Sequence, residues 1–171
     1  MPNPFPLSAK PSMHGFTLME MIVVIAIIGI LASFVMVRLN EARRSARAVK
    51  ARAEVNQIRK AVSMLETDTG EWPGHQTIDD VQSGAGGNEI WDLNVPGAGL
   101  VVTDGAFLRW RGPYMTVIPL DPWGNAYFFD TDYDVDPGAG QTWAAVVGSF
   151  GLNGIGPNVY DSDNIYEILV S

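Results

Sequence analysis

The sequence predicts an α+β fold in which one long N-terminal helix packs on a small C-terminal antiparallel sheet. Gly and Pro are both absent from Leu31 to Thr69, and apolar residues recur in the second half of that stretch at three- and four-residue spacing. This spacing is typical of an amphipathic helix. Aromatic and β-branched runs separated by glycine-rich turns follow after residue 126, and such runs are typical of strands.

The segment 16–37 is long and apolar enough to cross a membrane. Met21 to Val37 contains 17 consecutive residues without a charged side chain, and with the residues from Phe16 the helix would be about 33 Å long at 1.5 Å per residue. Glu20 lies near the start of this segment. Because burying an isolated carboxylate costs several kcal/mol, we expect Glu20 to be protonated, to have a partner or to reach the membrane interface.

The helix is expected to continue as an amphipathic extension over residues 38–69, giving one helix of about 50 residues. Gly70 and Pro73 then end it. The apolar stripe of the extension is too short for an independent coiled coil, so we expect it to pack on the chain's own sheet. The stripe consists of Val55, Ile58, Val62 and Leu65.

Residues 70–171 are expected to form a globular β domain. The runs "AYFFDTDYDV" and "TWAAVVGSF", separated by "DPGAGQ", predict a hairpin, and "IYEILV" predicts a last strand. The chain before them predicts a loop with one short helix at residues 89–93. The aspartates at positions 130, 132, 134 and 136 alternate along the first run. We interpret them as a solvated strand face rather than a weak cation site.

Charge is distributed unevenly along the chain, whose net charge is -8. Residues 38–60 carry eight bases against two acids, whereas from Val62 onward 16 acids face two bases. The basic segment is expected to face solvent, anionic lipid headgroups or the acidic domain of a neighbouring copy. A domain this acidic is not expected to bind nucleic acid, because contacts with phosphate groups require a basic surface. The chain has no cysteine, which excludes disulfides.

No enzyme is predicted. The two histidines, His14 and His75, have no nearby residues at the spacing of a nucleophile and its base. Residues 1–15 are interpreted as a detachable leader, because they precede the apolar segment and are rich in proline. Six bases follow the apolar segment up to Arg52 while only Lys10 precedes it, so the positive-inside rule alone would place the C-terminal domain in the cytoplasm.

The stretch "GFTLMEMIVVIAIIGILAS" resembles the class III signal of type IV pilins and type II secretion pseudopilins. In that signal, a glycine is followed by a phenylalanine, "TL" and a glutamate. The stretches "MLETDTGEWP", "GPYMTVIPLDPWGNAYFF" and "SFGLNGIG" with "DSDNI" are similar to the major, G-type pseudopilin. The resemblance covers nearly everything after Met13 except residues 91–106.

The resemblance implies processing and assembly. A prepilin peptidase would cut between Gly15 and Phe16 and methylate the new amine of Phe16. Glu20 would pair with that amine on the adjacent subunit and set axial register. The leader would lie in the cytoplasm and the C-terminal domain outside it, overruling the charge count. The protein would be a single-pass protein of the bacterial inner membrane that assembles into a periplasmic or extracellular filament.

The function implied is that of a structural subunit of a type II secretion pseudopilus. Its partners would be further copies of itself, minor pseudopilins, an inner-membrane platform protein and an assembly ATPase. Two alternatives remain open: a major type IV pilus subunit for adhesion, motility or DNA uptake, and an ordinary single-pass membrane protein with an exterior binding domain. The second alternative predicts no cleavage after Gly15.

The resemblance also implies a calcium site in the loop from Leu152 to Asp163. The expected ligands are the oxygen atoms of Leu152, Asn153, Asp161 and Asp163, which suit a hard cation. Asn153 stands where the family usually has aspartate, which lowers the expected charge of the site. Val37 stands where many relatives have a helix-kinking proline, so the helix lacks that place to melt during assembly.

Overall fold

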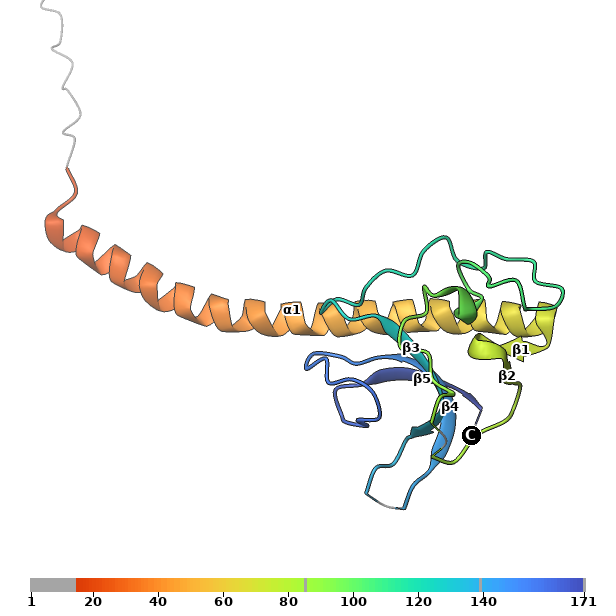
Figure 1. Ribbon diagram of the computed structural model, residues 1–171. Coiled ribbons are helices and arrows are strands. Elements are labelled where there is room, and N and C mark those ends of the chain that lie inside the picture. The colour runs from red at the N-terminus through yellow and green to blue at the C-terminus, as the bar shows by residue number, and fades with distance from the viewer. Residues whose placement is uncertain (1–14, 85, 139, 171) are drawn as a thin grey trace, which may run out of the picture. The chain divides into compact units, whose positions relative to one another are not determined.

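The computed structural model describes residues 15–84, 86–138 and 140–170. Most of the predicted leader lies outside them. The chain divides into two compact units, Met1–Ala42 and Arg43–Ser171. The predicted α+β class is confirmed, because one long helix accompanies small antiparallel sheets (Figure 1). The elements are α1 (Leu18–Thr69), β1 (Glu71–Trp72), β2 (Gln76–Thr77), β3 (Tyr127–Asp134), β4 (Trp143–Ser149), β5 (Ile165–Val170), and 3-10 turns at Pro73–His75 and Pro96–Ala98.

Helix α1 is continuous over 52 residues, as the absence of Gly and Pro from its second half predicts. It ends where predicted, at Gly70. The φ angle of Gly70 is 78°, and its N–H donates to the carbonyl oxygen of Glu66 at 2.8 Å. A left-handed residue that closes the last turn in this way favours glycine, because a Cβ would be strained there.

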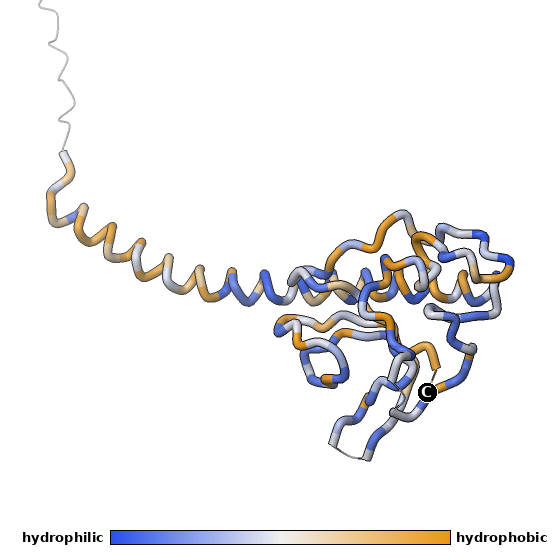
Figure 2. Tube along the Cα trace, in the orientation of Figure 1, coloured by the Kyte–Doolittle hydropathy of each residue, from blue (hydrophilic) through white to orange (hydrophobic). Residues whose placement is uncertain are grey.

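Within the first unit, the apolar part of α1 has no cover. The large apolar side chains from Met21 to Val37 are 45–70% exposed, and Figure 2 shows that hydrophobic residues dominate this stretch. α1 is the only helix of the described residues that is long and apolar enough to span a membrane. Because so much apolar surface is unfavourable in water, this stretch requires lipid or other protein around it.

Within the second unit, the predicted stripe of α1 is buried. Its members Val55, Ile58, Val62 and Leu65 are at most 1% exposed. They share one core with Tyr127 and Phe129 of β3 and with Ala145 and Val147 of β4. Burying one such aliphatic side chain contributes roughly 1.5–3 kcal/mol. The expectation that the stripe packs on the chain's own sheet is therefore confirmed.

The sheet consists of β3, β4 and β5 in that order, all antiparallel. β3 and β4 form the predicted hairpin, with Tyr127 opposite Ser149 and Asp134 opposite Trp143. β5 is the predicted last strand and pairs Ile165 with Ser149. The register of β3 shifts between Asp130 and Tyr133, which marks a β-bulge.

The other face of the sheet is covered by a second cluster of aromatic side chains. Phe128 stacks on Phe150 with ring centroids 4.7 Å apart, and Trp91 lies 6.0 Å from Phe128. Asp130, Asp132 and Asp134 are buried beside this cluster. The interpretation of these aspartates as a solvated strand face is therefore wrong, because loops cover the face that the alternation alone assigns to water.

The predicted short helix at residues 89–93 is also wrong. Ile90 forms an antiparallel bridge with Phe129, with N–O distances of 2.8 and 2.9 Å. The N–H of Leu93 donates to the carbonyl oxygen of Tyr127 at 3.1 Å. This segment therefore extends along the edge of β3, because sheet hydrogen bonds outweigh a weak local helix preference.

His75 connects the turn after α1 to a distant loop. Its Nδ1 lies 2.7 Å from Glu71 Oε2, and its Nε2 lies 3.0 Å from Asp104 Oδ2. Its ring also stacks on Phe107 with centroids 4.0 Å apart. Hydrogen bonding to Asp104, and to a smaller extent to Glu71, raises the pKa of His75 despite partial burial. Protonated His75 therefore holds the two segments together.

We expect the substitution Asp104→Asn to flatten the dependence of stability on pH. Folded His75 binds its proton more tightly than the unfolded chain does. Its contribution is therefore complete below about pH 6.5 and is lost as the pH rises through the folded-state pKa. Melting temperatures measured from about pH 5.5 to pH 8.5 should fall more steeply in the wild type than in the variant. Parallel curves would contradict this role for His75.

The connection from β4 to β5 begins at a glycine that the close approach of two segments requires. The φ angle of Gly151 is 68°, and a Cβ built on it would clash with the carbonyl oxygen of Asp163. By contrast, a Cβ on Gly156 in the same loop would meet no atom within 4 Å. The two ends of the loop can therefore meet only because residue 151 lacks a side chain.

We expect Gly151→Ala to destabilise the protein by roughly 2 kcal/mol or more, because both the backbone conformation and the contact with Asp163 become strained. Gly156→Ala, the matched control, should change stability by less than about 0.5 kcal/mol. Denaturant unfolding measures both free energies. Equal effects of the two substitutions would show that the loop ends separate without cost.

Candidate functional site

The residues of the predicted signal lie at the start of α1. Gly15 is exposed, and a Cβ built on it would meet no atom within 4 Å. Phe16 is 80% exposed, and α1 begins two residues later at Leu18. The peptide bond between Gly15 and Phe16 is therefore accessible within the described residues, which the predicted cleavage requires.

Glu20 is bound to the end of its own helix. The backbone N–H of Thr17 donates to Glu20 Oε2 at 2.8 Å, and the Thr17 hydroxyl donates to the same oxygen at 2.9 Å. In return, the N–H of Glu20 donates to Thr17 Oγ1 at 3.2 Å. This reciprocal arrangement is a capping box, which satisfies backbone donors that the first turn of a helix leaves free.

The capping box changes what Glu20 requires from its surroundings. Its carboxylate has hydrogen-bond partners but forms no ion pair within the described residues. A positive group brought to it therefore adds charge compensation without first having to supply hydrogen bonds to a bare carboxylate. The capping box is not among the features predicted from the sequence. The signal was present as "TLME", a threonine followed three residues later by glutamate ahead of an apolar run.

The predicted calcium loop brings three of its four expected ligands together. Asn153 donates from Nδ2 to Asp161 Oδ2 at 2.7 Å and from its backbone N–H to Asp163 Oδ2 at 3.2 Å. The N–H of Asp163 donates to Asp161 Oδ1 at 2.9 Å. Leu152, the fourth expected ligand, has a side chain that is 53% exposed, and among the described residues it forms no hydrogen bond to the other three.

The ligand atoms of this loop are of the type that calcium prefers, but the loop supplies few carboxylates. Its atoms are hard oxygens from Asp161, Asp163 and the amide of Asn153, the type that calcium prefers. Neither aspartate pairs with a base in the described part of the chain. That part also contains no group of three or more His, Cys, Asp or Glu side chains placed to hold a metal. With two carboxylates in place, a calcium ion there would be bound weakly.

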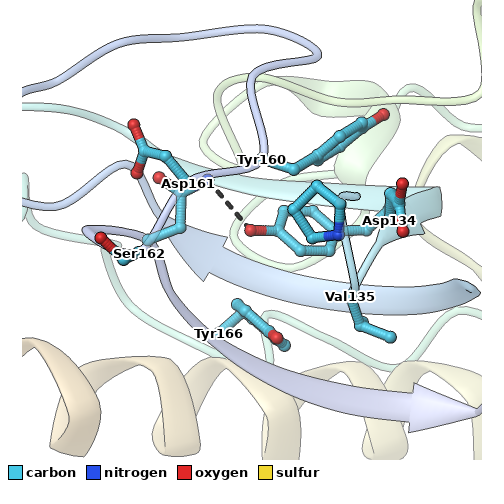
Figure 3. Close-up of a pocket in the computed structure, with 9 residues that line it drawn as sticks. Asp134, Val135, Tyr160, Asp161, Ser162 and Tyr166 are labelled. Carbon is cyan, nitrogen blue, oxygen red and sulfur yellow. Dashed lines mark hydrogen bonds between the residues drawn. The ribbon is translucent and has the colours of Figure 1, made fainter. Parts of the chain in front are cut away.

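A pocket of about 340 Å³ opens beside this loop (Figure 3). Tyr160, Asp161 and Tyr166 line it from the loop and β5, and Asp134 lines it from β3. Tyr133 and Asn164 line it too, and the hydroxyl of Tyr133 accepts a hydrogen bond from Asn164 Nδ2 at 3.0 Å. Burial raises the pKa of Tyr133 to about 12, so this phenol stays neutral.

Comparisons with known proteins agree with the N-terminal motif. The family described as the prokaryotic N-terminal methylation motif matches residues 10–36. The type II secretion system core protein G of Aeromonas hydrophila is 33% identical over 119 residues, covering 69% of this chain and 73% of that protein. The protein of the same name from Escherichia coli is 31% identical over 121 residues, covering 71% and 74%.

The likeness also extends into the C-terminal domain. The core protein G of Xanthomonas campestris is 28% identical over 161 residues, which cover 93% of this chain and 93% of that protein. The shared length therefore includes the sheet and its loops as well as the apolar helix. With the methylation motif and these relatives, the chain belongs to the family of the type II secretion system core protein G, the major pseudopilin.

Proposed function

We propose that this protein is the filament-forming pseudopilin of a type II secretion system. The observation that carries the proposal is an apolar helix that begins with a processing motif and lies uncovered along its first half. A single helix of this kind anchors the chain in a membrane before assembly. Copies that leave the membrane would bury the same surface against one another, and that burial would drive polymerisation.

Processing would prepare the chain for assembly. Cleavage between Gly15 and Phe16 by a prepilin peptidase creates an amine that the precursor lacks, and that amine would then be methylated. Glu20 of a neighbouring copy is the acceptor that we assign to this amine. A charge-assisted hydrogen bond at that point would fix the axial position of each subunit, since it forms only at one register.

The proposed orientation places the C-terminal domain outside the cytoplasm of the bacterial inner membrane. The filament would extend into the periplasm or beyond it. An assembly ATPase, a platform protein and minor pseudopilins are the further partners proposed. The two alternatives, a type IV pilus subunit and an ordinary membrane protein with a binding domain, are not favoured, because the relatives named above are all core protein G.

The test separates the charge of Glu20 from its role in the capping box. Glu20→Gln keeps an acceptor for the Thr17 N–H but removes the charge, whereas Thr17→Val removes the hydroxyl and keeps the charge. We expect Glu20→Gln to abolish filaments and Thr17→Val to retain them, with a loss of helix stability of roughly 0.5–2 kcal/mol. Electron microscopy of cells that supply the assembly components measures the filaments.

Mass spectrometry of the N-terminus controls for processing. Both variants and the wild type should begin at a methylated Phe16, because neither substitution touches the cut bond. Normal filaments from Glu20→Gln would refute the charge pairing and leave capping as the role of Glu20. A wild-type chain that keeps residues 1–15 in the presence of the peptidase would favour the ordinary membrane protein.

We also propose that calcium binds the loop from Leu152 to Asp163. The support is the convergence of Asn153, Asp161 and Asp163 in a chain that has no disulfide to close the loop. When bound, calcium would neutralise the two carboxylates and hold the ends of the loop together. The side chains of Asn153, Asp161 and Asp163 and the carbonyl oxygen of Leu152 are the groups assigned to it.

Calcium should raise the melting temperature of the full-length protein in detergent micelles by several degrees relative to a chelator. A ligand at a hundred times its Kd stabilises by about 2.7 kcal/mol. The double substitution Asp161→Asn with Asp163→Asn should reduce this rise, while Asp136→Asn, at an exposed turn position, should leave it unchanged. An equal rise in all three proteins would exclude the loop as the site.

A further inference from the structure

Strand β3 carries three buried aspartates that the function described above does not use. Asp130, Asp132 and Asp134 are 1%, 3% and 6% exposed. Asp134 is explained by the hairpin turn, because its Oδ1 accepts the backbone N–H groups of Asp136 and Thr142, both at 3.1 Å. Asp132 has no such role, and Asp130 accepts one backbone N–H, that of Asp132; both lie at the β-bulge of β3.

The two carboxyl groups are linked to each other and to a buried amide. The backbone N–H of Asp132 donates to Asp130 Oδ1 at 2.8 Å. Asn88, which is 4% exposed, reaches them from the preceding loop. Its Nδ2 donates to Asp132 Oδ1 at 2.8 Å and to the hydroxyl oxygen of Thr131 at 2.6 Å. Four oxygen-bearing residues therefore meet in one buried place.

Two oxygen atoms of this group lack partners. Among the described residues, Asp130 Oδ2 and Asn88 Oδ1 are both buried and accept no hydrogen bond. Buried polar atoms without partners are rare in folded proteins, since each costs about 1–3 kcal/mol. The unpartnered amide oxygen belongs to the side chain that already lies against Asp132. A half-turn of the Asn88 amide would bring that oxygen to the carboxylate.

Nothing among the described residues balances the charge of this group. No Lys, Arg or His pairs with Asp130 or Asp132 there, and Glu89 adds a further negative charge nearby. Because isolated buried carboxylates are costly, a proton or a cation has to accompany the pair.

We propose that Asp130, Asp132 and Asn88 form a buried site for a hard divalent cation of the calcium type, separate from the loop after β4. Two carboxylate groups, an amide oxygen and the Thr131 hydroxyl are all hard oxygen donors, which favours calcium over softer metals. Calcium would use the two unpartnered oxygens and neutralise both carboxylates. The strand that carries them would then be held to the loop at Asn88.

The test begins from the Asp161→Asn and Asp163→Asn double variant, so that the other proposed calcium site is already lost. Isothermal titration of the full-length variant in detergent micelles with calcium chloride should show one ion bound per chain. Adding Asp130→Asn should weaken that binding roughly tenfold or more, because affinity follows the charge of the ligands. Adding Asp134→Asn, the matched buried aspartate on the same strand, should leave it unchanged.

The substitution Asn88→Asp should change calcium affinity in the opposite direction. If the amide oxygen is a ligand, a carboxylate in its place should tighten calcium binding roughly tenfold. This variant also decides the matter if circular dichroism shows that Asp130→Asn does not fold. A folded loop variant that binds no calcium would overturn the proposal in favour of a proton shared by the pair. Binding that is indifferent to both Asp130→Asn and Asn88→Asp would overturn it too.

Discussion

The covering of the apolar surface of α1 is the constraint on which the rest of the structure depends. The helix presents apolar side chains from its first turn to Leu65, but the chain itself covers only those from Ala51 onward. The C-terminal sheet exists to supply that cover, with Tyr127, Phe129 and Val147 against the helix. The uncovered part determines where the protein can be stable, which is in a bilayer or among copies of itself.

Aspartates hold together the loops of a domain that has no disulfide. In six places among the described residues, an aspartate oxygen accepts the N–H of the residue two positions later, a geometry that fixes a turn locally. Asp121 in "DPWGN" does most, since it accepts the N–H of Trp123 at 3.0 Å, that of Asn125 at 2.8 Å and the Ser149 hydroxyl at 2.6 Å. The six are Asp92, Asp104, Asp121, Asp130, Asp134 and Asp161.

The sequence predicted the elements whose signals are long and periodic. The length of α1, its end at Gly70, its buried stripe and the hairpin of β3 with β4 all follow from spacing and turn composition. The wrong predictions concern tertiary contacts. Local pattern could not show that Ile90 would pair with Phe129 or that loops would cover Asp130 and Asp132, because both depend on segments distant in sequence. The capping box was a local signal that was overlooked.

The candidate sites divide in the same way. The motif at Gly15, Phe16 and Glu20 could be identified from contiguous residues, and the family comparisons agree with it. The loop ligands depend on the return of the chain from Asn153 to Asp163, which spacing alone does not determine. The group at Asp130 could not be found from sequence, since Asn88 reaches it from more than forty residues away. The cation-binding roles proposed for the group at Asp130 and for the loop after β4 stay predictions.

The capping box of Thr17 and Glu20 bears on how reversible the proposed filament would be. A subunit that detached from it would not leave a bare carboxylate, since Glu20 can return to the N–H and hydroxyl groups of Thr17. With the pairing proposed for Glu20, leaving would cost only one charge pair and the helix contacts. Subunits could then re-enter the bilayer and be used again, and the proposed filament could shorten as well as grow.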